Sequence, residues 1–439
     1  MRKIVVGVCL VCLLSVGVGI GAAGASQVVV IKNGRVLPMN GPAIEGGVVI
    51  VENGKIVRVG KDLPVPEGAT VIDAAGGWVL PGLIEAHTTI GLRDDSGPYG
   101  PSNSDELSDP ATAQLLVLDA LNPFDKSLKH AREAGITAAL VTPGRGNVIG
   151  GQAAVVRLAG KTVEEMTILS PAGIKFSLGE GPKEAYGGKG RLPSTRMGSA
   201  YVVRKALLEA GEYLKKAKDY EAAKAKAKGK AKDGKAVEEA QAPKRDLALE
   251  PLAALLDGKL PAFVECYRAD DIMTALRLVD EFKFKAVLIG CAEGFRVAGE
   301  IAKRGIPVIV GPLGIGPKRI ETMEVTIANA AILAKAGVKV VLEAEEGALG
   351  IGALEELPLA AALAVKGGLD RDSALRAITL SAAEVLGVAS RIGSLEAGKD
   401  ADVVVFDGDP LDYRTRVKAV LLGGQVLTFD KQVTKPGRI

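Results

Sequence analysis

Residues 260–267 read LPAFVECY and open a stretch in which a short apolar run is followed by an amphipathic segment, four times in succession. The four apolar runs are LPAFVECY (260–267), KAVLIGC (285–291), IPVIVGP (306–312) and KVVLEAEE (339–346). Strands that are apolar on both faces and alternate with single helices indicate a parallel sheet covered on both sides. The number of repeats favours a closed (β/α)8 barrel, with functional residues at the C-terminal ends of its strands.

Both ends of the chain carry shorter, alternating strand patterns. The N-terminal part, from Gln27 to Asp73, contains Asn33-Gly34 and Asn53-Gly54, which we expect to form hairpin turns. ADVVVF (401–406) and VKAVLLGGQVL (417–427) provide matching strands near the C-terminus. Neither end has enough strands for an independently stable sheet, so the two are predicted to pair. The expected domains are a β-sandwich from residues 26–78 and 395–439, and a barrel from residues 79–394.

The N-terminus predicts export. Arg2 and Lys3 precede an apolar run from Ile4 to Ile20, which leads into Ala23-Gly24-Ala25. The run is short for a bilayer span and an A-x-A pattern follows it, so we expect a cleaved signal peptide over residues 1–25. An uncleaved N-terminal anchor is the alternative. Cleavage predicts a periplasmic or secreted protein that has no further contact with the membrane.

Composition and charge indicate no charged partner. The net charge is +3, and without Arg2 and Lys3 it is 3 − 2 = +1. Aromatic residues make up 4% of the chain, which argues against a nucleic-acid surface lined with rings. After signal cleavage Cys266 and Cys291 are the remaining cysteines. Each follows by one residue a position expected to face the barrel interior, Glu265 or Gly290. On neighbouring strands both should therefore point outward toward the helices, so we expect two buried free thiols.

Residues 215–235 interrupt the strand–helix rhythm with nine lysines against three acidic residues. A basic tail for anionic partners is one interpretation. We favour a solvated, partly helical insertion in a barrel loop, spanning residues 215–245, because Lys/Ala runs rarely form specific binding surfaces.

The chain contains only two histidines, His87 and His130. No binuclear metal site built on four imidazoles can therefore be assembled, whatever the fold. His130 follows Pro123 on a predicted helix, where we expect a surface or packed helix residue.

The sequence resembles the exported members of the amidohydrolase superfamily, close to the imidazolonepropionase-like branch. The segments that carry the resemblance are NGRVLPM (33–39), GGWVLPGLIEAHTTIGL (76–92), PSTRMG (193–198), IPVIVGP (306–312) and ALRAITLSAAEVLGVASRIGSLEAGKDADVVVFDGDPL (374–411). The resemblance implies a metal-dependent barrel beside a β-sandwich made from both chain ends. It also implies hydrolysis of amides, mostly cyclic amides, or other C–N bonds by a metal-activated water.

Most metal ligands implied by the resemblance are substituted in this chain. The first strand of the family carries two histidines, and here His87 matches the first while Thr89 replaces the second. Lys175 corresponds to the lysine that is carbamylated in many binuclear members.

The remaining ligand positions are also altered. The histidines of strands five and six correspond to Glu265 and Gly290. The strand-eight aspartate, which is both ligand and general base in the family, corresponds to Glu345 or, as the second choice, to Glu346.

Three interpretations of this residue set stay open. In the first, Lys175 is a free ammonium that neutralises Glu265 and Glu345, no cofactor is bound, and a catalytically degenerate barrel acts as a binding or partner subunit. In the second, His87, Glu265 and Glu345 hold one divalent ion, zinc or manganese, and Gly290 leaves room for substrate. In the third, the two glutamates divide acid and base roles without a metal. The second and third predict an active hydrolase of C–N bonds in cyclic amides, other non-peptide amides or dipeptides.

Three further residues are expected to contact a small-molecule ligand at the barrel mouth. TPGRGNVIGGQ (142–152) lacks a P-loop lysine and serine, so a tight turn is expected there, with Asn147 and Gln152 as substrate contacts. Arg196 is expected either to bind a substrate carboxylate or to form a structural ion pair. The resemblance also leaves open a homo-oligomer, or pairing with an active relative.

Overall fold

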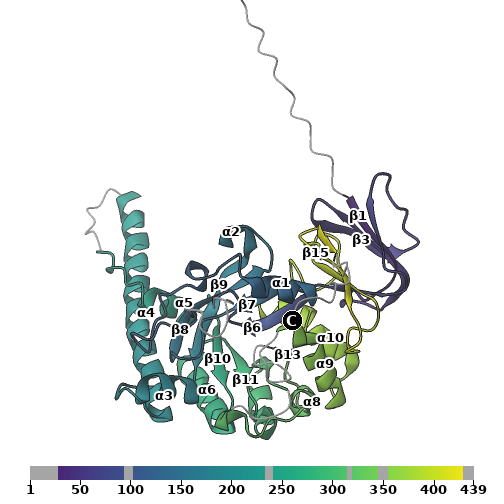
Figure 1. Ribbon diagram of the computed structural model, residues 1–439. Coiled ribbons are helices and arrows are strands. Elements are labelled where there is room, and N and C mark those ends of the chain that lie inside the picture. Colours follow the sequence, from purple (N-terminus) through teal and green to yellow (C-terminus); the bar gives the residue numbers. More distant parts are fainter. Residues whose placement is uncertain (1–27, 93–101, 233–240, 314–318, 345–353, 429–439) are drawn as a thin grey trace, which may run out of the picture.

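The computed structural model describes residues 28–92, 102–232, 241–313, 319–344 and 354–428. Two sheets organise these residues, one built from the two ends of the chain and one that forms the barrel (Figure 1). The signal peptide expected over residues 1–25 lies outside the described residues. Within the described ranges, no helix is long and apolar enough to span a bilayer.

The first sheet joins the chain ends, as predicted. Its strand order is β16-β15-β14-β5-β1-β2-β3, with β4 paired to β1. The junction is an antiparallel pairing of β14 with β5, in which Val403 lies opposite Pro81. The strands are β1 (Val28–Val36), β2 (Ile44–Glu52), β3 (Lys55–Lys61), β4 (Thr70–Asp73), β5 (Trp78–Pro81), β14 (Val403–Phe406), β15 (Val417–Leu422) and β16 (Gln425–Thr428).

The two Asn-Gly pairs have different roles in this sheet. Asn53-Gly54 forms the hairpin turn between β2 and β3, as expected. The expectation of a hairpin at Asn33-Gly34 is wrong, because both residues lie inside β1 at an irregularity of its pairing with β2. The Asn33 amide donates to Asp73 at 2.8 Å, and a Cβ on Gly34 would lie 2.6 Å from Val79. Close packing with β4 and β5 therefore explains this pair better than a turn does.

The second sheet is an almost closed ring whose strands follow one another in chain order. They are β6 (Leu83–Thr88), β7 (Ile136–Val141), β8 (Ile149–Arg157), β9 (Thr167–Ser177), β10 (Ala262–Cys266), β11 (Ala286–Gly290), β12 (Val308–Val310) and β13 (Val340–Leu342). The barrel is confirmed, but β8 runs antiparallel to both of its neighbours. The loop from β7 to β8 is too short for the crossover that a parallel strand requires, so it forms a hairpin.

Most of the helices pack against the outside of the barrel, whereas α11 contributes to its interior core. Side chains just before a helix can cap its first turn. Helix α1, for example, begins after Asp125, whose carboxylate accepts the N–H of Ser127. The helices are α1 (Lys126–Glu133), α2 (Val163–Met166), α3 (Glu180–Gly187), α4 (Arg196–Lys232), α5 (Leu249–Leu256), α6 (Ala269–Phe282), α7 (Ala298–Ala302), α8 (Asn329–Lys335), α9 (Leu357–Lys366), α10 (Arg371–Ala377) and α11 (Leu380–Val385). Short 3-10 turns are η1 (Val117–Asp119), η2 (Gly294–Arg296), η3 (Ile320–Thr322) and η4 (Leu354–Glu356).

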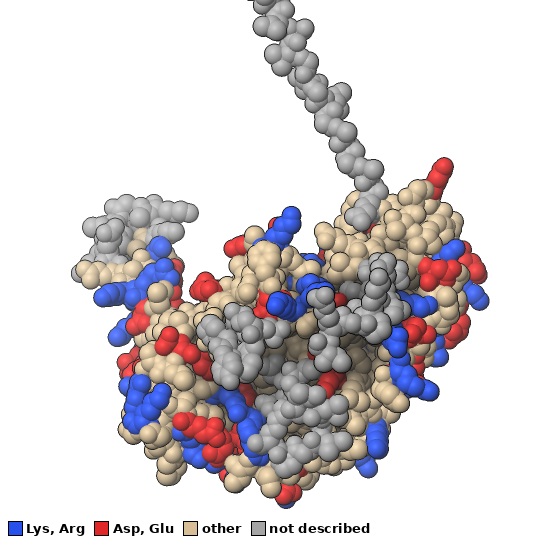
Figure 2. Space-filling view, in the orientation of Figure 1, with Lys and Arg blue, Asp and Glu red and all other residues tan. Residues whose placement is uncertain are grey.

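The Lys/Ala-rich segment continues helix α4, which rises beyond the neighbouring helices (Figure 1). The part of the expected insertion up to Lys232 is therefore helical, and residues 233–240 lie outside the described ranges. Figure 2 shows positive and negative side chains interspersed over the visible face, in keeping with the small net charge.

Alternation along the strands separates two cores. On β10, Phe263 packs inside the barrel, whereas Val264 and Cys266 pack against the helices. Cys291 joins the same outer core, and both cysteines are buried free thiols, as predicted. Ala383 from α11 belongs to the interior core, which fills the barrel with apolar side chains.

Candidate functional site

Four ionisable side chains meet at the C-terminal ends of the barrel strands. His87 lies near the end of β6, Lys175 on β9, Glu265 on β10, and Glu343 directly after β13. Lys175 is fully buried, and the other three are at most 5% exposed. Charges buried this deeply are tolerated only when they are paired and hydrogen-bonded.

Lys175 is the centre of this cluster. Its Nζ lies 2.7 Å from Glu265 Oε2 and 2.9 Å from His87 Nε2. An ammonium has only donors, so His87 Nε2 must accept and Nδ1 must carry the ring proton. That proton is donated to Glu343 Oε2, which lies 2.6 Å from Nδ1. The contacts form one hydrogen-bonded chain from Glu265 to Glu343.

Glu265 is held as a carboxylate. Burial by itself would raise the pKa of Glu265, but the charge and hydrogen bond of Lys175 outweigh burial and lower that pKa to about 2. The second carboxylate oxygen, Oε1, accepts the Tyr267 hydroxyl at 2.9 Å. Both oxygens of Glu265 are therefore engaged by neighbouring side chains.

The Tyr267 ring also occupies the space next to Gly290. A Cβ on Gly290 would lie 2.7 Å from the tyrosine ring, and Gly290 has a φ of +85°, which favours glycine. The expectation that Gly290 leaves room for substrate is wrong, because the ring of Tyr267 already fills that space. Sequence reasoning missed Tyr267, although it lies only two residues after Glu265.

Glu343 and Glu85 connect the first and last strands of the barrel. Glu85 accepts the backbone N–H groups of His87 at 3.2 Å and of Ala344 at 3.0 Å. Gly311 provides the space for Glu343, since a Cβ there would lie 2.4 Å from its Cγ. The neighbouring strands thus fix the carboxylate that orients His87.

The strand-eight carboxylate expected at Glu345, or alternatively at Glu346, lies outside the described residues. The structure places Glu343 beside His87 instead, and sequence reasoning missed it. A usable signal was present, because Val341 packs inside the barrel and every second residue after it faces the same way. Glu343 satisfies that rule.

Within the described residues, no group of three or more His, Cys, Asp or Glu side chains is arranged to hold a metal. The two donor atoms that converge, His87 Nε2 and Glu265 Oε2, are both bonded to the Lys175 ammonium. A cation at this position would have to displace another cation, which like-charge repulsion opposes.

A second layer of charge borders the cluster around Glu321 in η3. Burial, together with the nearby charge of Glu265, raises the pKa of Glu321 to about 7, although the Glu180 N–H and Arg145 act in the opposite direction. Arg145 and Arg319 approach its Oε1 to 3.8 and 3.6 Å. The Arg319 guanidinium also lies over the Tyr267 ring, 4.6 Å from its centroid. Cationic side chains thus connect Glu321 to the central cluster.

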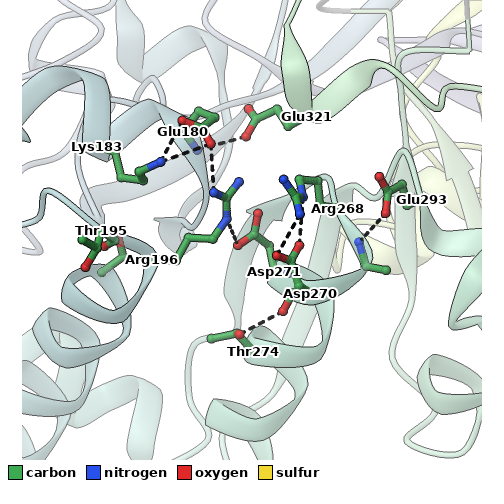
Figure 3. Close-up of polar contacts among 12 residues, drawn as sticks. Glu180, Lys183, Thr195, Arg196, Arg268, Asp270, Asp271, Thr274, Glu293 and Glu321 are labelled. Carbon is green, nitrogen blue, oxygen red and sulfur yellow. Dashed lines mark hydrogen bonds and ion pairs between the residues drawn. The ribbon is translucent and has the colours of Figure 1, made fainter.

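Arg196 forms the structural ion pair raised as one alternative. Its Nε donates to Asp271 at 2.8 Å, and its Nη1 lies 2.9 Å from Glu180 (Figure 3). Burial would lower the pKa of Arg196, but the hydrogen bond and charge of Asp271 raise it. The guanidinium ties the first turn of α4 to α6 and α3.

Asn147 and Gln152 contact the preceding loop. The Asn147 amide donates to the Glu106 carbonyl at 2.7 Å, and its Oδ1 accepts the Tyr186 hydroxyl at 2.6 Å. The Gln152 amide donates to the Ala113 carbonyl at 3.2 Å. These bonds shape the segment around the barrel mouth, and contact with a substrate stays a prediction. His130 is exposed on α1, as expected.

A comparison with known protein families agrees with the barrel and the joined chain ends. The family described as "Amidohydrolase family" matches residues 78–429 of this chain. The chain belongs to the amidohydrolase family. This membership covers the whole barrel and the C-terminal strands of the first sheet.

Several relatives of this amidohydrolase-family chain are informative. It is 35% identical to an amidohydrolase from Thermotoga maritima MSB8, with a TM-score of 0.81 over 91% of this chain and 99% of that one. It is 28% identical over 405 residues to amidohydrolase tasK of Hapsidospora irregularis, covering 88% of this chain and 40% of tasK. A shorter match, 46% over 100 residues, links it to a 5'-deoxyadenosine deaminase of Methanococcoides burtonii, with 21% and 23% of the two chains covered. The chain thus spans less than half the length of these two curated relatives.

Proposed function

We propose that this protein is an exported, catalytically degenerate member of the amidohydrolase family, which acts as a binding or partner subunit. The observation that carries the proposal is the position of Lys175, whose Nζ is bonded to both His87 and Glu265. In a metal-dependent relative, a divalent cation neutralises the acidic groups at the strand ends. Here one ammonium does so.

The second support is the packing around Tyr267. Its ring occupies the volume that a side chain at Gly290 would need, and its hydroxyl is bonded to Glu265. The glycine at position 290, where the family resemblance implies a histidine, leaves the space that the Tyr267 ring fills. This close packing supports a rebuilt, stable centre instead of a damaged one.

The ligand of the proposed binding protein is a small molecule at the barrel mouth. Relatives named as amidohydrolases and as a deaminase act on bonds between carbon and nitrogen. We therefore place amides and cyclic amides first among the candidate ligands. The buried ion cluster would form the floor of this site, and its fixed geometry favours binding without large rearrangement.

A second candidate is metal-free hydrolysis of the same bonds. The chain of hydrogen bonds from Tyr267 through Glu265, Lys175 and His87 to Glu343 favours it, because it joins several groups that can exchange protons. In this candidate Glu265 and Glu343 hold the proton-accepting ends, and Lys175 sets the protonation state between them.

Metal content and hydrolysis, measured on the same preparation, separate these candidates. We expect mass spectrometry of purified, undialysed protein to find metal far below one ion per chain, and expect no hydrolysis of dipeptides or cyclic amides. Stoichiometric metal, with hydrolysis that a chelator abolishes, would overturn both candidates. Chelator-insensitive hydrolysis lost in Glu265→Gln and retained in Lys183→Met would replace the first candidate with the second.

A further inference from the structure

Cys266 and Cys291 are two buried thiols that the proposed function does not use. Cys266 is the last residue of β10, and Cys291 directly follows β11. The two strands are hydrogen-bonded neighbours in the barrel (Figure 1). Both cysteines have no exposed surface, and both belong to the outer core. The two sulfurs are therefore enclosed in the same apolar layer between the strands and the helices.

A left-handed turn brings Cys291 to the same side of the sheet as Cys266. The register partner of Cys266 is Gly290, so regular alternation would turn the next residue, Cys291, to the opposite face. Gly290 and Cys291 instead have φ values of +85° and +48°, and the second value is uncommon for a residue with a side chain. Because of this turn, Cys291 packs in the outer core together with Cys266.

Hydrogen bonds hold the two cysteines beside each other. The N–H of Cys291 donates to the carbonyl of Cys266 at 2.8 Å. The carbonyl of Cys291 accepts the N–H of Gly294 at 2.7 Å and the Asn329 amide at 2.9 Å. The side chains interact as well, since a hydrogen bond with Cys291, together with burial, raises the pKa of the Cys266 thiol. Neighbouring strands are about 4.8 Å apart and disulfides join Cα atoms about 4.4–6.8 Å apart, so this placement suits a disulfide.

We propose that Cys266 and Cys291 form a disulfide when the reduced chain folds in contact with a small-molecule disulfide such as oxidised glutathione. The thiolate of one cysteine attacks the small disulfide, which forms a mixed disulfide and releases one molecule of glutathione. The thiolate of the other cysteine then attacks the protein sulfur of the mixed disulfide and releases a second molecule of glutathione. In total the two cysteines lose two electrons and two protons, and oxidised glutathione takes up both.

Burial determines when this bond can form. Neither sulfur is exposed in the folded chain, so a small disulfide reaches them while the chain is folding. Disulfides form in oxidising compartments, and the export that we propose would deliver the unfolded chain to one. The chemistry itself depends neither on export nor on the activity of the barrel centre.

The cross-link would tie together two strands that carry the candidate site. Cys291 lies 25 residues after Cys266, and the loop that the bond closes contains α6. The bond would join β10 to β11 next to the contact of the Tyr267 ring with Gly290. An oxidised chain would therefore hold the floor of the proposed ligand site covalently.

Peptide mapping after refolding tests the pairing. The full chain is reduced, unfolded in urea and refolded with either oxidised glutathione or dithiothreitol, and the remaining thiols are alkylated in denaturant. Trypsin places the two cysteines in separate peptides, residues 260–268 and 286–296. We expect mass spectrometry to find these two peptides joined after oxidative refolding and both alkylated after refolding with dithiothreitol. Alkylated cysteines after oxidative refolding, glutathione retained on either one, or a link to the peptide that carries Cys9 and Cys12 would each overturn the proposal.

Urea unfolding tests whether the bond belongs to the native fold. Closing a loop of this length should lower the unfolding equilibrium constant of the oxidised chain on the order of 100-fold relative to the reduced chain. Cys266→Ala is the matched control, because it removes one sulfur and should unfold at the same urea concentration after either refolding. An oxidised parent that is no more stable than the reduced parent would overturn the proposal, since the bond would then distort the strands that it joins.

Discussion

Replacing Lys175 by methionine tests the ion cluster most directly. Methionine keeps most of the length and apolar volume of lysine but removes the ammonium that contacts Glu265 and His87. Glu265 would remain buried without its counter-charge. Breaking a buried pair by removing one partner destabilises a protein by roughly 3–5 kcal/mol.

The pKa of Glu265 gives a second route to this magnitude. It is about 2 in the folded protein, against an ordinary value of 4.5. The difference of about 2.5 corresponds to about 3 kcal/mol. A carboxyl with a depressed pKa contributes stability that is fully present above the unfolded value and is lost as the pH falls from about 4.5 toward 2. The deficit of Lys175→Met should therefore be largest near neutral pH and shrink in acid.

Urea unfolding of parent and variant at several pH values measures this effect. Lys183→Met is the matched control, because Lys183 pairs with Glu180 near the surface and should cost less than about 1 kcal/mol. Adding Glu265→Gln to Lys175→Met should recover part of the loss, since the unpaired carboxylate is gone. A Lys175→Met deficit below about 1 kcal/mol, or one independent of pH, would refute the reasoning. Strong stabilisation of the parent by added zinc or manganese, abolished in His87→Ala, would point to a metal site instead.

Three further predictions concern the fold and the surrounding site. A chain that ends before Lys399 loses β14–β16 and should also lose cooperative melting of β1–β5; melting at the parent temperature would contradict the joined sheet. Gly290→Ala should destabilise the protein by about 1–3 kcal/mol through its contact with the Tyr267 ring, and by clearly less in a Tyr267→Ala background, as urea unfolding of all four proteins would show. Glu321 has a pKa of about 7, above the ordinary 4.5. Its stabilising contribution to the free energy of unfolding is therefore present below about pH 4.5 and is lost as the pH rises through 7. Glu321→Gln should therefore gain up to about 3 kcal/mol relative to the parent at pH 8 and nearly nothing at pH 4, whereas a gain equal at both pH values would contradict this assignment.

The sequence by itself determined the architecture and much of the candidate site. Apolar runs that alternate with amphipathic helices predict the barrel, and strand patterns at both ends predict the joined sheet, because these periods follow from local backbone geometry. Counting the histidines excluded a centre of four imidazoles before any folding was considered. His87, Lys175 and Glu265 could be named because the family resemblance aligns them with ligand positions of the family.

Only the tertiary structure decided which side chains meet. Glu343 contacts His87 across the ring, and Tyr267 covers Gly290 from the neighbouring strand. The Tyr267 contact depends on the register of β10 with β11 and on the positive φ at Gly290, and the Glu343 contact brings together residues 256 positions apart in the chain. The reversed direction of β8 likewise depends on its pairing with two neighbours. Local periodicity fixes the face on which a side chain lies, but packing between strands fixes the atoms that it touches.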